Sequence, residues 1–556
     1  MASHMGVPQV GEASPSVRYD ATGMTDDLPT YPSRPSYKEF HSALCVDTMC
    51  VVFEGASSDP YKPASVPIYQ TATFVQPSAS EFGSYDYTRS GNPTRTALEK
   101  HVAMLEGAHA AFAFGSGMAA LAAVTRLLRA GDELLVGEDI YGGMHRLVSK
   151  VTSALHGVVV KFVDTTDLRA VEAALTPATR MLHMETPSNP LMRISDVGAL
   201  KALLAPRGVL LSIDSTMMSP ILQRPLSMGA DIVIHSATKF FGGHSDVMGG
   251  LVCLNDAALT KQIAFFQNAE GNGLDPNSCW LFLRGIKTLA LRVERAQASA
   301  VQVAAFLRSH HLVKDVFYPG TPSRQGAAAA AEAALHNRQA KGGGSLLSFT
   351  TGNTAISRRI IDALRIFKLT VSFGSVSSLC EMPCFLSHAS IPAHLRKLPE
   401  DLVRLSVGIE SPQDLLHDLQ QALELAMHPH VINVRSVRRR DTADALGLEA
   451  LSTGGAAAAA TPSSGSGSGS SGALAIAVPE TPSHREDVAA VAQAQCSRLQ
   501  ASNAELRRKL EEAESVLAIW RQARQSVWGP QGLLAASAAV AGLALAIGLL
   551  LANAKR

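Results

Sequence analysis

The sequence predicts an α/β protein whose main sheet is mostly parallel and covered by helices. Between about residues 75 and 300, short apolar runs that are typical of buried strands alternate with stretches of helical periodicity. The apolar runs include residues 157–160, 209–213 and 231–234, and residues 96–106 form one of the helical stretches. This alternation is typical of strands joined by crossover helices, which places the strands side by side in a parallel sheet.

Three segments make up the first 428 residues. Residues 1–60 are rich in Pro, Ser and Asp and lack sustained periodicity, so we expect an N-terminal leader or arm. Residues 61–300 form the large sheet domain. Residues 301–428 form a smaller α+β domain, in which we expect a strand at 345–349 and a closing helix near 412–426.

After residue 428 the composition changes. A Gly/Ser/Ala/Thr tract at 452–473 indicates that residues 429–484 are a flexible linker. Within residues 485–528, positions that recur every seven residues predict a coiled coil. The a positions are Ala489, Cys496, Asn503, Leu510, Leu517 and Arg524. The d positions are Ala492, Leu499, Leu506, Ala513, Trp520 and Val527. The polar Asn503 favours two strands, but since several seam positions are alanine or charged, a lone amphipathic helix is the alternative.

Residues 532–552 are uncharged and almost wholly apolar. At about 1.5 Å per residue, a helix of this length crosses the roughly 30 Å of a bilayer core. Because only four residues follow, the sequence predicts a single-pass C-terminal transmembrane tail anchor. We expect the protein on an intracellular membrane, with the preceding domains facing the cytosol.

Charge and cysteine content narrow the partners. There are 49 Lys and Arg residues against 48 Asp and Glu residues, a formal charge of +1, so no overall field indicates nucleic acid. A small-molecule partner is therefore expected. Seven cysteines without disulfide spacing indicate a reducing compartment. Cys380 and Cys384 lack a second Cys or His pair at ligand spacing, so no metal site is predicted.

Lys239 and Asp214 carry the main chemical signal. Lys239 lies twenty-five residues after Asp214, which ends an apolar run. A lysine can hold an aldehyde cofactor as a Schiff base, and a carboxylate at the end of a strand can keep a pyridine nitrogen protonated. These residues predict pyridoxal 5'-phosphate as the cofactor. Tyr141, which two glycines follow, is a candidate to stack on the cofactor ring.

Six further residues are suited to the phosphate of this cofactor. They are Gly117, Met118, Tyr87, Arg89, Ser236 and Thr238. The first two lie in a Gly-Ser-Gly-Met turn before a helical stretch, where backbone N–H groups favour an anion. The next two supply a phenol and a bidentate guanidinium, and the last two supply hydroxyls near the lysine.

The spacing of Ser236 and Lys239 also fits another class of enzyme. Ser-x-x-Lys occurs in penicillin-recognising serine enzymes. The Ser-Asp-Asn and Lys-Thr-Gly companions of that class are missing from this sequence. We therefore favour the pyridoxal-phosphate interpretation.

Residues 60–428 resemble the cysteine/methionine-metabolism family of fold-type I pyridoxal-phosphate enzymes. Five ordered stretches carry the resemblance, and they are residues 85–94, 114–118, 185–190, 235–250 and 404–410. The resemblance implies a homodimer or homotetramer in which Tyr87 and Arg89 reach the cofactor phosphate of a neighbouring subunit. It also implies that Lys239 moves protons and that Arg404 binds the substrate α-carboxylate, helped by Asn189 and Ser372.

Members of this family cleave or form cystathionine. Residues 371–392 resemble plant-type cystathionine β-lyases, and several γ-acting members place a glutamate where Ser377 stands. The resemblance implies a carbon–sulfur lyase that converts L-cystathionine to homocysteine, pyruvate and ammonia. A cystathionine γ-lyase or γ-synthase is the alternative within the family, and a non-catalytic membrane-tethered scaffold is an alternative of another class. Arg146 is a candidate for the distal end of cystathionine or, equally, for a surface salt bridge.

Overall fold

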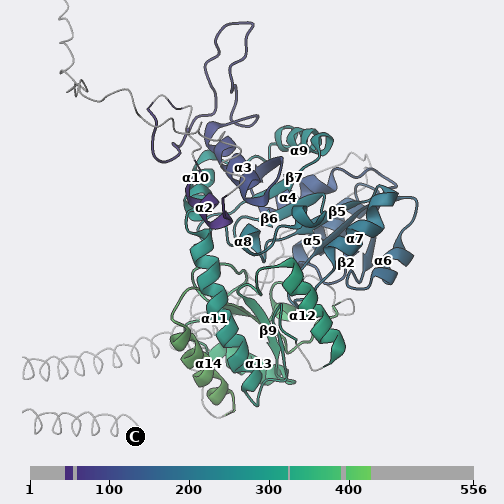
Figure 1. The fold of residues 1–556 in the computed structure, drawn as a ribbon, viewed down its shortest axis with the longest axis vertical. Coiled ribbons are helices and arrows are strands. Elements are labelled where there is room, and N and C mark those ends of the chain that lie inside the picture. The colour runs from purple at the N-terminus through teal and green to yellow at the C-terminus, as the bar shows by residue number, and fades with distance from the viewer. Residues whose placement is uncertain (1–43, 54–58, 60, 323–325, 390–395, 428–556) are drawn as a thin grey trace, which may run out of the picture. The chain divides into compact units, whose positions relative to one another are not determined.

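A computed structural model of the chain describes residues 44–53, 59, 61–322, 326–389 and 396–427 (Figure 1). Nearly all of the predicted leader, the linker at 429–484, the coiled coil at 485–528 and the membrane anchor at 532–552 lie outside these residues. Within the described ranges, none of the helices combines the length and the apolar character needed to cross a membrane.

Seven strands form the large sheet, in the order β1-β7-β6-β5-β4-β2-β3. The strands are β1 (Ala110–Phe114), β2 (Glu133–Gly137), β3 (Val159–Val163), β4 (Thr179–Glu185), β5 (Leu210–Asp214), β6 (Ile232–Ser236) and β7 (Gly250–Leu254). Strands β3, β2, β4, β5 and β6 pair in parallel, and only β7 runs antiparallel to its two neighbours. The sheet is therefore mixed but mostly parallel.

Helices cover both faces of this sheet. They are α2 (Val46–Val51), α3 (Pro93–Glu106), α4 (Gly117–Thr125), α5 (Gly142–Leu147), α6 (Leu168–Ala174), α7 (Val197–Leu204), α8 (Ser219–Leu222), α9 (Ala257–Ala269) and α10 (Pro276–Ile286). Because successive strand residues point to opposite faces, Ile232 and Ile234 pack in one hydrophobic cluster and Val233 packs in another. Burial on both faces explains why the strands are continuous apolar runs in the sequence.

A second sheet of five strands has the order β10-β11-β12-β9-β8. Its strands are β8 (Asp315–Phe317), β9 (Leu346–Thr350), β10 (Lys368–Leu369), β11 (Leu379–Glu381) and β12 (Val403–Ser406). Its helices are α12 (Ala327–Gln339), α13 (Thr354–Ala363) and α14 (Pro412–Ala426). The strand expected at 345–349 corresponds to β9, and the expected closing helix corresponds to α14. Around this sheet lies a separate hydrophobic cluster.

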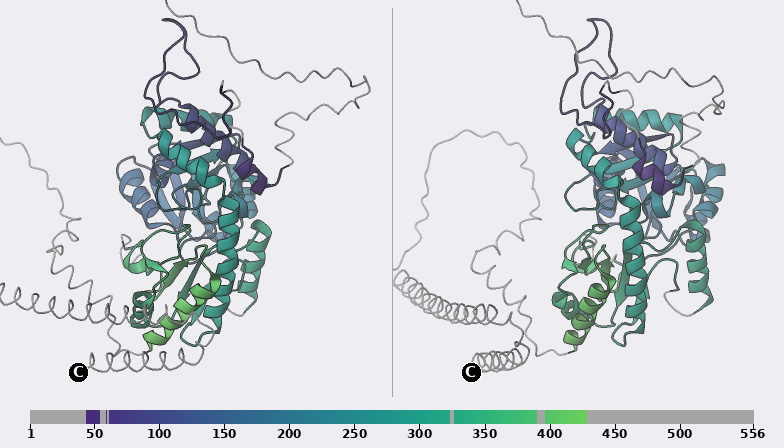
Figure 2. Two further views of the ribbon diagram at one scale, coloured as in Figure 1. Left: turned by 90° about the vertical axis from the view of Figure 1, so that its left-hand side faces the viewer. Right: turned by 60° about the vertical axis from the view of Figure 1, so that its left-hand side comes forward.

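The helix α11 (Leu289–Ser309) joins the two sheet regions. Leu289 and Val293 belong to the hydrophobic cluster of the large sheet, whereas Ala300 and Val303 belong to that of the small sheet. Figure 1 and Figure 2 show this helix running alongside both regions. The predicted boundary at residue 300 therefore falls inside a continuous helix, at the point where its side chains change from one core to the other.

Candidate active site

A pocket of about 300 Å³ lies at the C-terminal ends of the parallel strands. Glu185, Asp214 and Ser236 are the last residues of β4, β5 and β6, and all three line it. Ligands gather at this edge in open α/β sheets. The small domain supplies further lining residues, among them Ser372 and Arg404.

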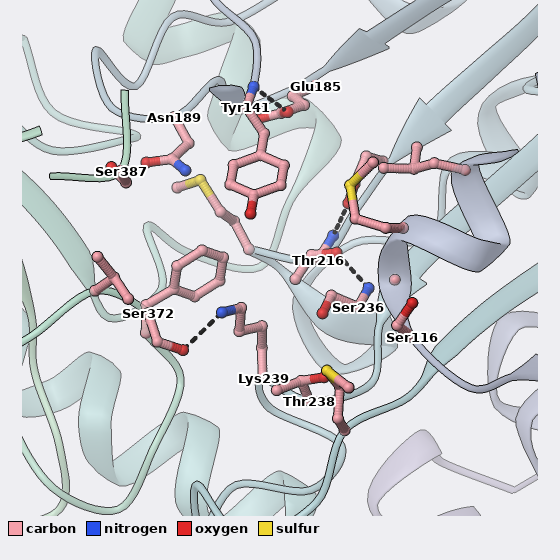
Figure 3. A pocket seen from close by; sticks show the side chains of 18 of the residues that line it. Ser116, Tyr141, Glu185, Asn189, Thr216, Ser236, Thr238, Lys239, Ser372 and Ser387 are labelled. Atoms are coloured by element: carbon pink, nitrogen blue, oxygen red, sulfur yellow. Dashed lines mark hydrogen bonds between the residues drawn. The ribbon is translucent and has the colours of Figure 1, made fainter. Parts of the chain in front are cut away.

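Lys239 enters this pocket three residues after the end of β6. Its Nζ donates a hydrogen bond to Ser372 Oγ at 2.6 Å, as Figure 3 shows. Burial, with a further contribution from the Arg404 guanidinium, lowers the pKa of Lys239 to about 8. A substantial fraction of the amine is therefore neutral near neutral pH, which nucleophilic attack on an aldehyde requires.

Asp214 and Glu185 are neighbouring carboxyl groups, because β4 and β5 pair them in register. The Thr216 N–H donates to Asp214 Oδ1 at 2.9 Å, and the Tyr141 N–H donates to Glu185 Oε1 at 2.8 Å. Burial raises the pKa of both groups, and the adjacent Asp214 charge helps to raise the pKa of Glu185 well above its usual range. Both carboxyl groups therefore bind a proton more tightly than free ones, and the shift is the larger at Glu185.

Tyr141 is the N-cap residue of α5, and its ring points into the pocket (Figure 3). A Cβ atom built on Gly143 would collide with the ring atom Cε1 of Tyr141. The second glycine after the tyrosine is therefore required for the aromatic ring to lie where it does. Tyr141 is 39 % exposed, which leaves room for a planar ligand against its ring.

The N-terminus of α4 forms the wall suited to an anion. Ser116 caps this helix by accepting a hydrogen bond from a backbone N–H at 3.1 Å. The first N–H groups of a helix, here including those of Gly117 and Met118, have no partner within the helix. Gly117 packs so closely on β6 that an added Cβ would lie 2.9 Å from that of Ser236. Together with the nearby Thr238 hydroxyl, this arrangement fits a phosphate group.

Arg404 lies on β12 and is 3 % exposed. Its guanidinium forms an ion pair with Glu381 at 2.7 Å, and it donates to Asn189 Oδ1 at 3.0 Å and to the Ser372 carbonyl at 2.8 Å. Its Nε–H group is buried without a hydrogen-bond partner among the described residues. A buried donor without a partner at the edge of the pocket fits the carboxylate of an incoming ligand.

Three predicted residues do not line the pocket, namely Tyr87, Arg89 and Arg146. Tyr87 is 44 % exposed, and Arg89 lies beside its ring and donates to Asn268 Oδ1 at 3.2 Å. Arg146 is exposed on α5, and its candidate role stays a prediction.

Comparisons with known proteins agree with this geometry. Residues 47–424 match the family described as Cys/Met metabolism PLP-dependent enzyme. The chain is 53 % identical over 381 residues to the chloroplastic cystathionine beta-lyase of Mimosa pudica, covering 68 % of this chain and 82 % of the relative. It is 52 % identical over 369 residues to that of Arabidopsis thaliana, covering 66 % and 78 % respectively.

A solved structure is also similar. The crystal structure of cystathionine gamma-lyase from Lactobacillus plantarum, complexed with L-serine, matches with a TM-score of 0.66 and 39 % identity. The match covers 69 % of this chain and all of that one. The predicted α/β fold of type I and the predicted pyridoxal-phosphate cofactor are thereby confirmed. The chain belongs to the family of pyridoxal-phosphate-dependent enzymes of cysteine and methionine metabolism.

Proposed function

We propose that the chain is a pyridoxal-phosphate-dependent carbon–sulfur lyase that cleaves L-cystathionine by β-elimination. The products are homocysteine, pyruvate and ammonia, which places the enzyme in methionine biosynthesis. One observation carries the proposal: the Lys239 amine, with its lowered pKa, shares a pocket with Asp214 and Arg404. The choice of β-elimination is supported by the 53 % identity to a protein named cystathionine beta-lyase.

Three residues would hold the cofactor ring and move protons. Lys239 would hold the aldehyde carbon, Asp214 would keep the ring nitrogen protonated, and Tyr141 would lie against the ring. Bound pyridoxal phosphate supplies an electron sink for negative charge at the substrate Cα. The released amine of Lys239 takes the proton from this Cα atom, because its lowered pKa leaves it neutral often enough to act as a base.

The substrate α-carboxylate would bind to Arg404 through the Nε–H group that has no partner among the described residues. Asn189 orients the guanidinium by accepting from it at 3.0 Å. Ser372 holds both Arg404 and Lys239, through its carbonyl and its hydroxyl respectively. Its φ of 96° lies in the left-handed region, a strained conformation that is often associated with functional sites.

The cofactor phosphate would bind at the N-terminus of α4, with hydroxyls from Ser236 and Thr238. We assign the remaining contacts to Tyr87 and Arg89 of a second copy of the chain, in a homodimer or homotetramer. In support of this assignment, both residues are exposed and lie outside the pocket of their own chain.

Mixing two inactive variants tests the shared site. A Lys239→Ala chain retains Arg89, and an Arg89→Ala chain retains Lys239, so a mixed dimer contains one complete site. Activity should appear on refolding or subunit exchange of the mixture. A mixture as inactive as its components, despite proven mixed dimers, would contradict the assignment of Arg89 to the neighbouring site.

The reaction itself is tested by giving the purified protein L-cystathionine and assaying both keto acids and both thiols. Pyruvate with homocysteine supports β-elimination, whereas 2-oxobutyrate with cysteine would identify a γ-lyase, the activity named for the solved relative at 39 % identity. Neither product from a protein with visible cofactor absorbance would direct the search to γ-synthase substrates. Absence of that absorbance, even after incubation with the cofactor, would favour the non-catalytic scaffold.

The C-terminal region would attach this enzyme to an intracellular membrane, with the catalytic domains facing the cytosol. The apolar segment 532–552 would span the bilayer, and the heptads of 485–528 would pair two chains. A chain lacking residues 529–556 should move from the membrane pellet to the supernatant without losing turnover. Continued sedimentation with membranes would refute the anchor.

A further inference from the structure

A cavity of about 500 Å³ is separate from the pocket that contains Lys239 and shares no lining residue with it. Three segments line this cavity. They are residues 44–46 at the start of α2, residues 220–228 in and after α8, and residues 338–341 at the end of α12. We call it the basic cavity. Its size is in the range of cavities that bind small molecules.

The charged side chains in the described lining of the basic cavity are all cations. They are Arg224, Arg338 and Lys341, and none of them forms an ion pair with a carboxylate among the residues that the structure describes. Arg338 lies in the last turn of α12, where the helix dipole also favours a cation. That dipole does not account for Arg224, which is half-buried on another segment and has its Nη2 3.9 Å from the weak acceptor Met49 Sδ. Cations gathered in a cavity without carboxylates attract an anionic ligand.

Gln223 provides a second, independent indication of a ligand. Its side chain lines the basic cavity and is 3 % exposed. Its Nε2 and its Oε1 are both buried without a hydrogen-bond partner among the described residues. The amide of Gln339, which lines the same cavity, is paired instead, because it donates to the Ser195 carbonyl at 3.0 Å and accepts from the Val197 N–H at 2.8 Å. Since buried polar atoms in proteins nearly always have partners, the unpaired amide of Gln223 indicates a polar group inside the cavity.

We propose that the basic cavity binds a small organic polyanion, that is, a molecule with two or more carboxylate or phosphate groups. Arg224 and Lys341 contact its anionic oxygens, and the amide of Gln223 donates to and accepts from its polar groups. The apolar part of the wall, which includes Ile221 and Met228, packs against its carbon skeleton. Because this site shares no residue with the Lys239 pocket, the inference goes beyond the proposed function and does not depend on it.

Cys45 supplies a reporter for this site. Its thiol is exposed and lines the basic cavity, whereas Cys50, five residues further along the chain, is buried and serves as the internal control. The full-length, cofactor-loaded protein is alkylated with uncharged iodoacetamide, and modification of each cysteine is quantified by mass spectrometry. Citrate and inorganic pyrophosphate are the probes, at constant ionic strength. A probe that binds should slow alkylation of Cys45 in a saturable way, with half-saturation below about 1 mM, and leave Cys50 unchanged.

Variants of the lining residues connect this protection to the basic cavity. Arg224→Gln and Lys341→Gln should each raise the half-saturation concentration about tenfold, because each removes a charge-assisted hydrogen bond to the probe. Gln223→Leu should also raise it, yet its melting temperature should stay the same or increase, because an apolar side chain of similar size replaces an unpaired buried amide. Lys261→Gln, at an exposed position on α9, is the matched control and should leave the half-saturation concentration unchanged.

The two probes also distinguish the chemistry of the ligand. Saturable protection by citrate supports a site for carboxylates, and saturable protection by pyrophosphate supports a site for phosphates. Absence of protection by both probes would overturn the proposal, as would protection that is equally strong in the Arg224→Gln and Lys341→Gln proteins. A Gln223→Leu protein that melts at a lower temperature and binds the probe as the wild type does would refute the contact between the ligand and this amide.

Discussion

The pH dependence of Lys239 in the cofactor-free protein follows directly from its surroundings. Burial disfavours the charged amine, and the nearby Arg404 guanidinium does so as well, which lowers the pKa of Lys239 from 10.5 to about 8. At pH 7.5 a lysine with this pKa is neutral in about one molecule in four, against about one in a thousand at the ordinary value. Only the neutral amine attacks an aldehyde.

We therefore expect the rate of reconstitution with pyridoxal phosphate to rise with pH and to level off above about pH 9. Competitive acetylation, with the peptide that contains Lys239 quantified by mass spectrometry, should give a midpoint near pH 8. The same peptide in the urea-unfolded chain provides the reference and should titrate near 10.4. At pH 7.5, Lys239 in the folded chain should then be acetylated about two hundred times faster than a lysine that has the pKa of the unfolded chain.

A different profile would refute the reasoning. If acetylation of Lys239 in the folded, cofactor-free protein is still rising above pH 9.5, its amine is solvated as in the unfolded chain. A Lys239→Arg chain should lose the labelled peptide and all reconstitution, which shows that the signals belong to this residue. If reconstitution levels off near pH 9 but acetylation does not, the pH dependence arises from another group.

Three further predictions concern residues around the site. Gly250→Ala should raise the cofactor dissociation constant about tenfold in an absorbance titration, because the new methyl group collides with the backbone at the start of α4. Gly115→Ala is the control and should leave this constant unchanged, because the nearest neighbour of its added Cβ lies at 4.0 Å. Glu185→Gln should keep kcat within about threefold, since burial and the adjacent Asp214 raise the pKa of Glu185 well above its usual range and favour its neutral form, whereas Asp214→Asn should lower kcat more than a hundredfold. Asp418→Asn should lower the free energy of unfolding by about 1–3 kcal/mol in urea titrations, because its carboxylate accepts three consecutive backbone N–H groups.

The strand pattern in the sequence was sufficient to place several site residues. Asp214 ends an apolar run and Lys239 follows another, so the rule that ligands gather at strand ends brings the two together. The same rule applies to Glu185, which ends β4, yet the sequence patterns predict no role for it. Its importance depends on β4 lying beside β5, and the order of strands in a sheet is not contained in any local pattern.

Pairings between distant segments explain the other differences. The sequence does not predict Glu381 as a partner of Arg404, because the two residues are brought together by the antiparallel pairing of β11 and β12. Arg146 is exposed on α5 and does not line the pocket of its own chain, so its candidate role at the distal end of cystathionine stays a prediction. Lys368 and Asp246 line one cavity although they are more than a hundred residues apart in the chain.

The charged groups that line the described pocket differ in their partners and in the directions of their pKa shifts. Glu381 neutralises Arg404 at 2.7 Å, yet the Nε–H group of the arginine remains available for a carboxylate. Burial and the neighbouring Asp214 raise the pKa of Glu185 well above its usual range, and burial raises that of Asp214 as well. Lys239, with its lowered pKa, is then the group whose proton can be exchanged near neutral pH. The pocket therefore brings a carboxyl group, a guanidinium and a base together, and these are the groups that abstraction of an α-proton from an amino acid uses.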